Sequence, residues 1–330
     1  MRNRLVWIFL ALLVGGIVLQ YLFGIKMSRE DIHISARAEP LACIGGERVG
    51  EACSPGTILP ITNSLVMTIL VDLVLLLVII FGARNMQLVP RGFQNVVETV
   101  VEGFYNFALG IDRRNVSKFF PLPATIFIFF LVANMLGLIP GVGSIGICVP
   151  AEPEAAAAAP AAASSSVFSG LPGYCGAGNI LIPWLRAPAA DLNVTFAFAL
   201  VAVFMIEYFG VQALGLSYFT RFFNLREGAL GFFVSLIELI SEISRIISFA
   251  FRIFGNIFGG EVILIVMSFL LAYVLPLPFY GFELFVAFIQ AVIFAVLTLV
   301  FMSIAVVAHG GHEDHSPGEV AHGETQASPA

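Results

Sequence analysis

The sequence predicts an all-α integral membrane protein with about six hydrophobic helices. Hydrophobic residues make up 59% of the 330-residue chain and charged residues 12%, whereas soluble domains carry about 25% charged residues. The mean hydropathy is correspondingly high, at +0.96. The hydrophobic residues also gather in runs of about 20 residues, the length of a helix that spans a bilayer. Most of the chain is therefore expected to lie in lipid.

Composition also argues against several classes of function. The net charge is −6 and no basic stripe is present, so we expect no nucleic-acid partner. We expect no cofactor and no bound metal. The histidines of the polar tail fit no rigid ligand spacing: His309, His312, His315 and His322. Residues 309–330 are better interpreted as a disordered, solvated tail.

The hydrophobic runs give the elements in order: 5–24, 65–81, 122–140, 192–216, 231–274 and 282–308. The first follows Arg2 and Arg4, so it is either a signal peptide or a retained signal anchor. A retained helix is favoured because the run is long for a signal peptide. The fifth run is longer than a bilayer requires, so its helix must tilt steeply or leave the membrane.

Basic residues in the short loops predict the orientation. The loops 83–120 and 217–230 carry arginines, so both are assigned to the cytoplasm. The loops 25–60 and 141–190 then lie outside, although the first of them has four basic residues of its own. Six alternating elements leave both termini in the cytoplasm. Residues 91–109 have the apolar spacing of an amphipathic helix on the cytoplasmic surface.

The outer loops hold all four cysteines, which are Cys43, Cys53, Cys148 and Cys175. Because disulfides persist in oxidising compartments, one or two are expected, with Cys43–Cys53 and Cys148–Cys175 as the local pairing. Four cysteines allow three connectivities, and the alternative that the cysteines are free thiols also remains. The 141–190 loop contains the low-complexity stretch AEPEAAAAAPAAASSS, which is typical of a mobile insertion.

The fifth run carries a stripe of polar side chains. At about 100° per residue, three residues lie within about 40° of Arg252 around the helix axis: Glu238, Arg245 and Asn256. Glu242 lies at the edge of this stripe. Glu261, nine residues after Arg252, points to nearly the opposite face and lies ~13 Å further along the axis. This pattern predicts two polar paths that do not meet, with a fixed cation between them.

Arg252 has no acidic residue three or four positions away on its own helix. A charge at the bilayer centre costs roughly 2.5–3.5 kcal/mol or more, so this arginine needs an anionic partner from another chain or ligand. By contrast, Arg245 with Glu242 or Glu238 could be a structural pair. In the last run, Glu283 and Gln290 share one face. If the last two runs form an antiparallel hairpin through residues 276–281, Glu283 lies level with Glu261, and the two acids could hold a proton.

Four stretches now carry a resemblance. They are ITNSLVMTIL (61–70), PAADLNVTFAFAL (188–200), SFAFRIFGNIFGGEVI (248–263) and FIQAVIFAVLTLVFMSIA (288–305). Together they closely resemble subunit a of F-type ATP synthases, in order along residues 58–308. The resemblance divides the chain into an additional N-terminal helix and outer loop (1–57), the subunit a membrane domain (58–308) and the tail (309–330).

The resemblance implies a stator beside a rotating ring of c subunits, against which the last two helices would pack as a long tilted hairpin. Peripheral-stalk b subunits, the rest of the complex and the lipid bilayer are the other implied partners, in a bacterial cell membrane. Arg252 matches the family's essential arginine, which faces the ring carboxylate and separates two half-channels. The remaining implied path residues are Asn256, Glu261, Glu283, Gln290, Glu238, Asp191 and Asn193.

Some family members have histidine where this chain has Glu283. Here both members of the outer pair are acids, so we expect two carboxylates that share a proton. A secondary ion transporter is the alternative function, but such proteins tend to show inverted repeats and broken helices, and no internal repeat is present. A purely structural anchor gives no reason for an unpaired deep arginine.

Overall fold

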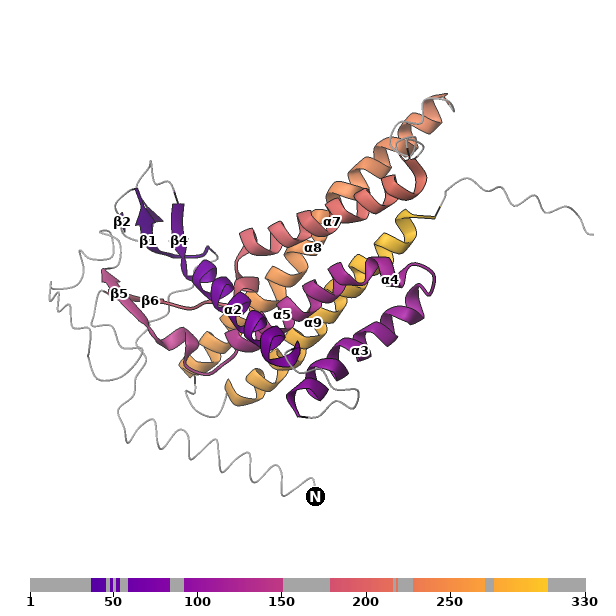
Figure 1. Ribbon diagram of the computed structural model, residues 1–330. Helices are drawn as coiled ribbons and strands as arrows, with labels where there is room; N and C mark the ends of the chain where they lie inside the picture. Colours follow the sequence, from indigo (N-terminus) through magenta and orange to yellow (C-terminus); the bar gives the residue numbers. More distant parts are fainter. Residues whose placement is uncertain are drawn as a thin grey trace, which may run out of the picture.

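The computed structural model describes residues 37–45, 48–49, 52–53, 59–83, 92–150, 179–215, 218, 228–270 and 276–307. Within these ranges the chain forms a helical bundle with small sheets at one end, here named the strand end (Figure 1). The helices are α2 (Asn63–Ala83), α3 (Phe93–Ile111), α4 (Val116–Phe119), α5 (Pro121–Gly137), α7 (Leu192–Leu214), α8 (Gly228–Leu270) and α9 (Pro276–Ala305). Short 3₁₀ turns are η2 (Val142–Ser144) and η3 (Pro188–Ala190).

The helices confirm an all-α membrane architecture. Four of those described, α2, α7, α8 and α9, are long and apolar enough to cross a membrane, and α5 is a shorter apolar helix of 17 residues. These five correspond to five of the expected hydrophobic runs. The expected first helix, at residues 5–24, lies outside the described residues, as do the Ala/Pro/Ser-rich stretch and the histidine tail.

The two segments assigned to outer loops contain short strands that the sequence did not predict. The antiparallel pairs are β1 (Pro40–Ile44) with β4 (Leu59–Thr62), β2 (Arg48–Val49) with β3 (Ala52–Cys53), and β5 (Gly146–Pro150) with β6 (Asn179–Pro183). A disulfide joins Cys43 to Cys53 across a Cα–Cα distance of 5.8 Å, which is the expected local pairing. Cys148 lies in β5, but Cys175 lies outside the described ranges, so that pairing stays a prediction.

Helix α8 has 43 residues, which corresponds to a length of ~64 Å against a hydrocarbon thickness of ~30 Å. It must therefore tilt or extend from the membrane, as expected. One expectation was wrong: residues 276–281 are not the turn before the last helix. Helix α9 already begins at Pro276, where the missing proline N–H leaves no helical hydrogen bond unmade. The connection from α8 falls in residues 271–275, which are not described.

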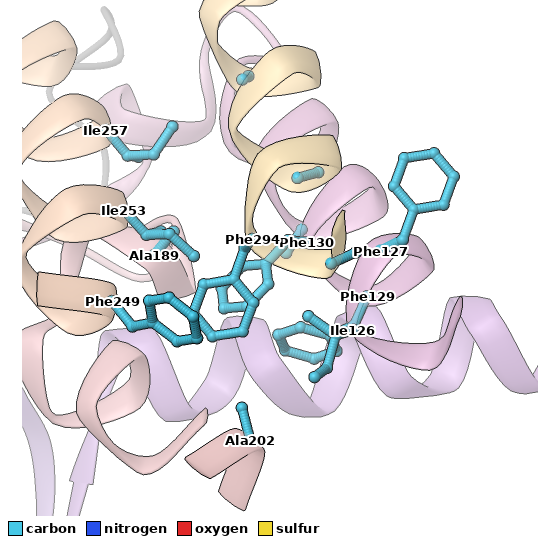
Figure 2. Packing of buried hydrophobic residues seen from close by; sticks show 14 of the residues in the cluster. Ile126, Phe127, Phe129, Phe130, Ala189, Ala202, Phe249, Ile253, Ile257 and Phe294 are labelled. Carbon is cyan, nitrogen blue, oxygen red and sulfur yellow. The ribbon is translucent and has the colours of Figure 1, made fainter. Parts of the chain in front are cut away.

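The core is built where α5, α7, α8 and α9 pack together. Alanines with no exposed surface line these contacts, at Ala199, Ala202, Ala250, Ala287, Ala291 and Ala295. Small side chains let helix backbones approach closely, which is how helices associate in lipid. Aromatic rings fill the remaining space: Phe294 lies 5.1 Å from Phe249 and 5.5 Å from Phe130 between ring centroids (Figure 2). This packing fixes α8 against α9, and those two helices carry most of the polar groups of the site.

Helix α3 confirms the expected amphipathic element. It buries Phe104 and Ala108, and the Phe104 ring stacks on Phe127 of α5 at 4.7 Å between centroids. After α3 ends, Asp112 accepts a 2.8 Å hydrogen bond from the hydroxyl of Ser303 in α9. The α3–α4 connection is thereby tied to the end of the last helix, away from the strand end (Figure 1).

Candidate functional site

Arg252 lies in the middle of α8 and is partly exposed. Among the described residues it makes no hydrogen bond and no ion pair. A guanidinium has five N–H donors, and in a membrane-spanning helix they need partners or water. The structure therefore leaves Arg252 open to a partner from outside this part of the chain.

A cavity of ≈ 250 Å³ lies beside Arg252, on the α8 side that leads away from the strand end. We name it the serine cavity, after three hydroxyl residues spaced along one face of α8. Its lining residues are Ser241, Ser244, Arg245, Ser248, Phe249, Arg252, Leu297 and Phe301. Arg245 donates a 2.7 Å hydrogen bond to Glu242, and its guanidinium lies 4.1 Å from the Phe301 ring centroid. Arg245 thus has an ionic partner on its own helix, unlike Arg252.

A larger cavity of ≈ 410 Å³ lies on the other side of Arg252, toward the strand end. We name it the glutamate cavity, after Glu283. Its lining residues are Gly255, Asn256, Gly259, Gly260, Ile263, Phe282, Glu283, Phe285, Val286, Ile289, Gln290 and Ile293. Asn256 donates a 2.8 Å hydrogen bond to Gln290, which joins α8 to α9. The structure therefore brings three of the predicted path residues together in one cavity.

Two buried polar atoms of the glutamate cavity have no hydrogen-bond partner in the described part of the chain. They are Oε1 of Glu283 and Nε2 of Gln290, whose residues are 4% and 3% exposed. Buried polar groups are nearly always hydrogen-bonded, to protein or to water. A cavity of this size has room for several water molecules, since each takes ~30 Å³. The site is thus suited to hold a water chain beside a carboxyl group.

Glu283 can occupy this position because residue 260 is a glycine. A Cβ at Gly260 would overlap the Glu283 carboxyl group, whereas at Gly259 it would meet no atom within 4 Å. The carboxyl therefore lies directly on the backbone of α8. Residue 260 is therefore a glycine because any larger side chain would collide with the Glu283 carboxyl.

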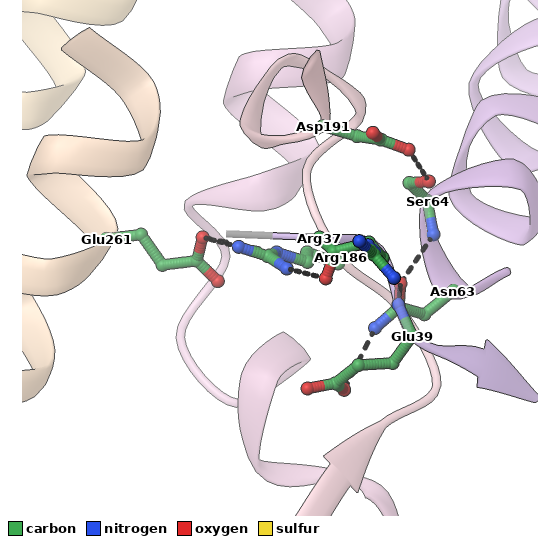
Figure 3. Close-up of polar contacts among 7 residues, drawn as sticks. All are labelled: Arg37, Glu39, Asn63, Ser64, Arg186, Asp191 and Glu261. Atoms are coloured by element: carbon green, nitrogen blue, oxygen red, sulfur yellow. Dashed lines mark hydrogen bonds and ion pairs between the residues drawn. The ribbon is translucent and has the colours of Figure 1, made fainter. Parts of the chain in front are cut away.

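Glu261 does not share a proton with Glu283 through a direct hydrogen bond in the structure. Its Oε2 instead accepts two hydrogen bonds from Arg186, at 3.3 Å from Nε and 3.1 Å from Nη2 (Figure 3). Arg186 is 6% exposed and the Glu261 side chain 34% exposed. Glu261 is thus paired with Arg186 in the structure, and a proton shared between the two acids stays a prediction. The reason for this pairing is rotation: adjacent helix positions differ by about 100°, so Gly260 faces Glu283 while Glu261 faces the loop before η3.

The remaining predicted residues lie away from the two cavities. Asp191 caps α7 by accepting the backbone N–H of Asn193 at 3.0 Å, and it accepts the hydroxyl of Ser64 at 2.6 Å (Figure 3). Asn193 is exposed in the first turn of α7. Glu238 lies on α8 three residues before Ser241 and is not among the residues that line the serine cavity. The contacts of Asp191 join the start of α7 to α2, away from both cavities.

Sequence reasoning missed Arg186 and the three serines. Arg186 stands in the short polar-poor stretch IPWLRAPAA, five residues before Asp191. An isolated cation between an apolar strand and a helix start is the signal that could have singled it out. Ser241, Ser244 and Ser248 have the spacing of one helix face, which periodicity could have revealed.

Comparison with known proteins decides the family. Residues 65–303 match the family model of the ATP synthase A chain. The chain belongs to the ATP synthase A chain family. Relatives named ATP synthase subunit a include that of Campylobacter jejuni subsp. doylei, 32% identical over 250 residues, which is 74% of this chain and 89% of the relative. That of Helicobacter hepaticus is also 32% identical, with 74% and 90% covered.

A more distant ATP synthase subunit a, from Moorella thermoacetica, is 27% identical over 252 residues, with 76% of this chain and 94% of the relative covered. Family membership makes this chain a membrane subunit of an ATP synthase, and its apolar helices make it a multi-pass membrane protein. Both cavities and Arg186 fall inside the matched residues. Arg37 and Glu39, which contact the site from the strand end, precede the match.

Proposed function

We propose that this chain forms the stationary half of the proton path in an F-type ATP synthase. It would load and unload the carboxyl groups of a rotating c-ring and thereby couple proton flow to rotation. The observation that carries the proposal is the position of Arg252, which has no ion pair in the described structure and separates two cavities along α8. Two separate cavities are what two offset half-channels require.

The glutamate cavity supplies the route by which a proton enters from the outer side. Glu283 holds the proton, and water joins it to the amide pair of Asn256 and Gln290. These groups lie on the part of α8 and α9 nearer the strand end. From here the proton passes to a carboxylate on the c-ring. The neutral carboxyl can then face lipid, which a carboxylate cannot do without a large desolvation cost.

The serine cavity supplies the route by which the proton leaves to the cytoplasm. Hydroxyl groups both donate and accept hydrogen bonds, so Ser241, Ser244 and Ser248 suit a water-filled exit. Glu238 lies beyond them on α8 and serves at the cytoplasmic mouth. Asp191 and Asn193 support the entry side through the start of α7 and its bond to α2.

Arg252 acts between the two routes. A guanidinium keeps its charge at physiological pH, so it stabilises the ring carboxylate after the proton has left. The same charge repels a proton that would pass directly from one cavity to the other. The ring carboxylate in turn offsets the cost, roughly 2.5–3.5 kcal/mol or more, of a lone arginine within the membrane.

The wider assembly follows from the same proposal. The exposed side of α8 and α9 faces the c-ring, peripheral-stalk b subunits hold the chain still, and both termini lie in the cytoplasm of a bacterial cell. The outward orientation of the strand end is supported by the disulfide between Cys43 and Cys53, since disulfides persist in oxidising compartments.

The test is substitution of Arg252 in membrane vesicles that contain the whole complex. Arg252→Ala should abolish ATP-driven proton pumping and proton-driven ATP synthesis, and Arg252→Lys should not restore them because a lysine lacks the planar five-donor group. Proton-driven ATP synthesis that persists in the alanine variant would refute the proposal. Proton movement without ATP and without a co-purifying ring would point instead to a secondary transporter.

A further inference from the structure

Arg186 links three parts of the chain at the strand end. Its Nε and Nη2 donate to Glu261 of α8, and its Nη1 donates a 3.0 Å hydrogen bond to the backbone oxygen of Arg37 (Figure 3). Its guanidinium also lies 5.8 Å from the ring centroid of Phe258. The side chain is 6% exposed, so its charge is held away from water and depends on Glu261.

The segment that receives Arg186 is itself firmly held. Asn63, at the start of α2, accepts the backbone N–H of Glu39 at 3.2 Å and donates its own backbone N–H to the Glu39 oxygen at 3.0 Å. Asn63 is fully buried. The strand that follows, β1, pairs with β4 and carries the disulfide between Cys43 and Cys53. The backbone oxygen that accepts a hydrogen bond from Arg186 therefore belongs to a segment held in place by hydrogen bonds and a nearby disulfide.

Glu261 and Glu283 face different surroundings although they lie near each other along the hairpin. Glu283 lines the glutamate cavity and has a buried oxygen without a partner, which leaves it able to take a proton from water. Glu261 is not among the residues that line this cavity, and its Oε2 accepts both hydrogen bonds from Arg186. The charged groups near Glu261 are Arg186 from the loop before η3 and Glu39 from the segment before β1, whereas Glu283 of α9 contacts the preceding residue, Gly260.

We propose that Arg186 is a positioning residue for proton entry: its hydrogen bonds hold the Glu261 carboxylate against residues 37–39, so that Glu283 alone carries the proton. This inference rests on the proposed function. It also gives a role to residues 37–39, which precede the residues matched by the family model. The backbone oxygen of Arg37 accepts the remaining hydrogen bond of Arg186. An ionised Glu261 balances the charge of Arg186, so the entrance carries no net positive charge that would repel protons.

The experiment compares three variants in vesicles of the whole complex: Arg186→Gln, Glu261→Gln and the double variant Arg186→Gln/Glu261→Gln. Each single variant leaves one buried charge without its partner, so we expect ATP-driven pumping to fall at least tenfold. The double variant removes both charges and leaves two amides that can bond to each other. It should pump within about threefold of the unsubstituted complex. Pumping by Arg186→Lys should lie between that of Arg186→Gln and that of the unsubstituted complex. A lysine keeps the charge, but one ammonium cannot make both contacts in the geometry of the guanidinium.

The pH dependence separates positioning from simple structural support. In Arg186→Gln, Glu261 is released as a second proton acceptor, so a plot of rate against outer pH should gain a titration step that the double variant lacks. Glu283→Gln should be defective in every background. A double variant that fails to pump or to assemble would overturn the inference, and so would an unchanged pH profile in Arg186→Gln. Arg252→Ala in the same vesicles distinguishes the failures: if it still couples, the proposed function fails, and if it does not, only the role of Arg186 is overturned.

Discussion

Gly260→Ala should impair proton transport without weakening the protein. The added Cβ would overlap the carboxyl group of Glu283, so that carboxyl must move, by on the order of 1 Å, away from α8. The Glu283 side chain then leaves its preferred rotamer at a cost of about 0.5–1.5 kcal/mol. Alanine in a helix is favoured over glycine by about 0.8–1.0 kcal/mol, which offsets that cost. The net change in stability is therefore near zero.

Transport should respond differently because proton transfer depends on geometry. Misplacement of a reacting group by about 1 Å can lower a rate by on the order of 100-fold. We therefore expect ATP-driven pumping by Gly260→Ala vesicles to fall by about 10- to 100-fold, with normal amounts of assembled complex. Gly281→Ala is the matched control, since a Cβ at this α9 position meets no atom within 4 Å and Gly281 lines neither cavity. Equal pumping by the two variants would refute the assigned position of Glu283.

Two further predictions concern stability. Arg245→Met removes the 2.7 Å charge-assisted hydrogen bond to Glu242, which is 7% exposed, and should destabilise the subunit by about 1.5–3 kcal/mol in thermal unfolding of the detergent-solubilised complex. At the α3–α4 connection, burial tends to raise the pKa of Asp112, but hydrogen bonds from Ser303 and nearby groups outweigh it and lower the pKa. The stabilisation is thus present at neutral pH and lost as pH falls through that lowered pKa, so Ser303→Ala should cost less than about 1 kcal/mol at pH 7 and nothing in acid.

The sequence was enough to predict the spans and the singular arginine. Hydrophobic runs located five of the described helices, because lipid demands about 20 apolar residues for each crossing. Arg252 has no acid three or four positions away along its helix, and the described residues give it no ion pair, so a partner from another chain stays a prediction. Helical periodicity likewise separated the stripe of Arg252 and Asn256 from Glu261, which contacts different partners.

What the sequence could not predict are contacts between distant segments. Arg186 and Glu261 are 75 residues apart, and nothing in either local pattern points to the other. Glu261 and Glu283 were expected to lie side by side because they have similar depths along the hairpin. Depth does not define how the two helices are rotated about their axes. In the structure Glu283 contacts Gly260, the residue before Glu261. The strands were missed because they are short and lie in loops that carry little periodicity.

The two arginines of the site, Arg186 and Arg252, differ in how their charges are balanced within the membrane. Arg186 is buried and satisfied within the chain, by Glu261 and by a backbone oxygen from a disulfide-braced segment, so its charge is fixed and cannot serve a moving partner. Arg252 lies at the boundary of two cavities and has no ionic partner in the described chain, so its charge is available. If both were paired internally, a passing carboxylate would find no stabilising cation. If neither were, the entrance would hold a free positive charge that repels protons. The division of roles between these two residues therefore gives the path both an entrance without net positive charge and a positive barrier.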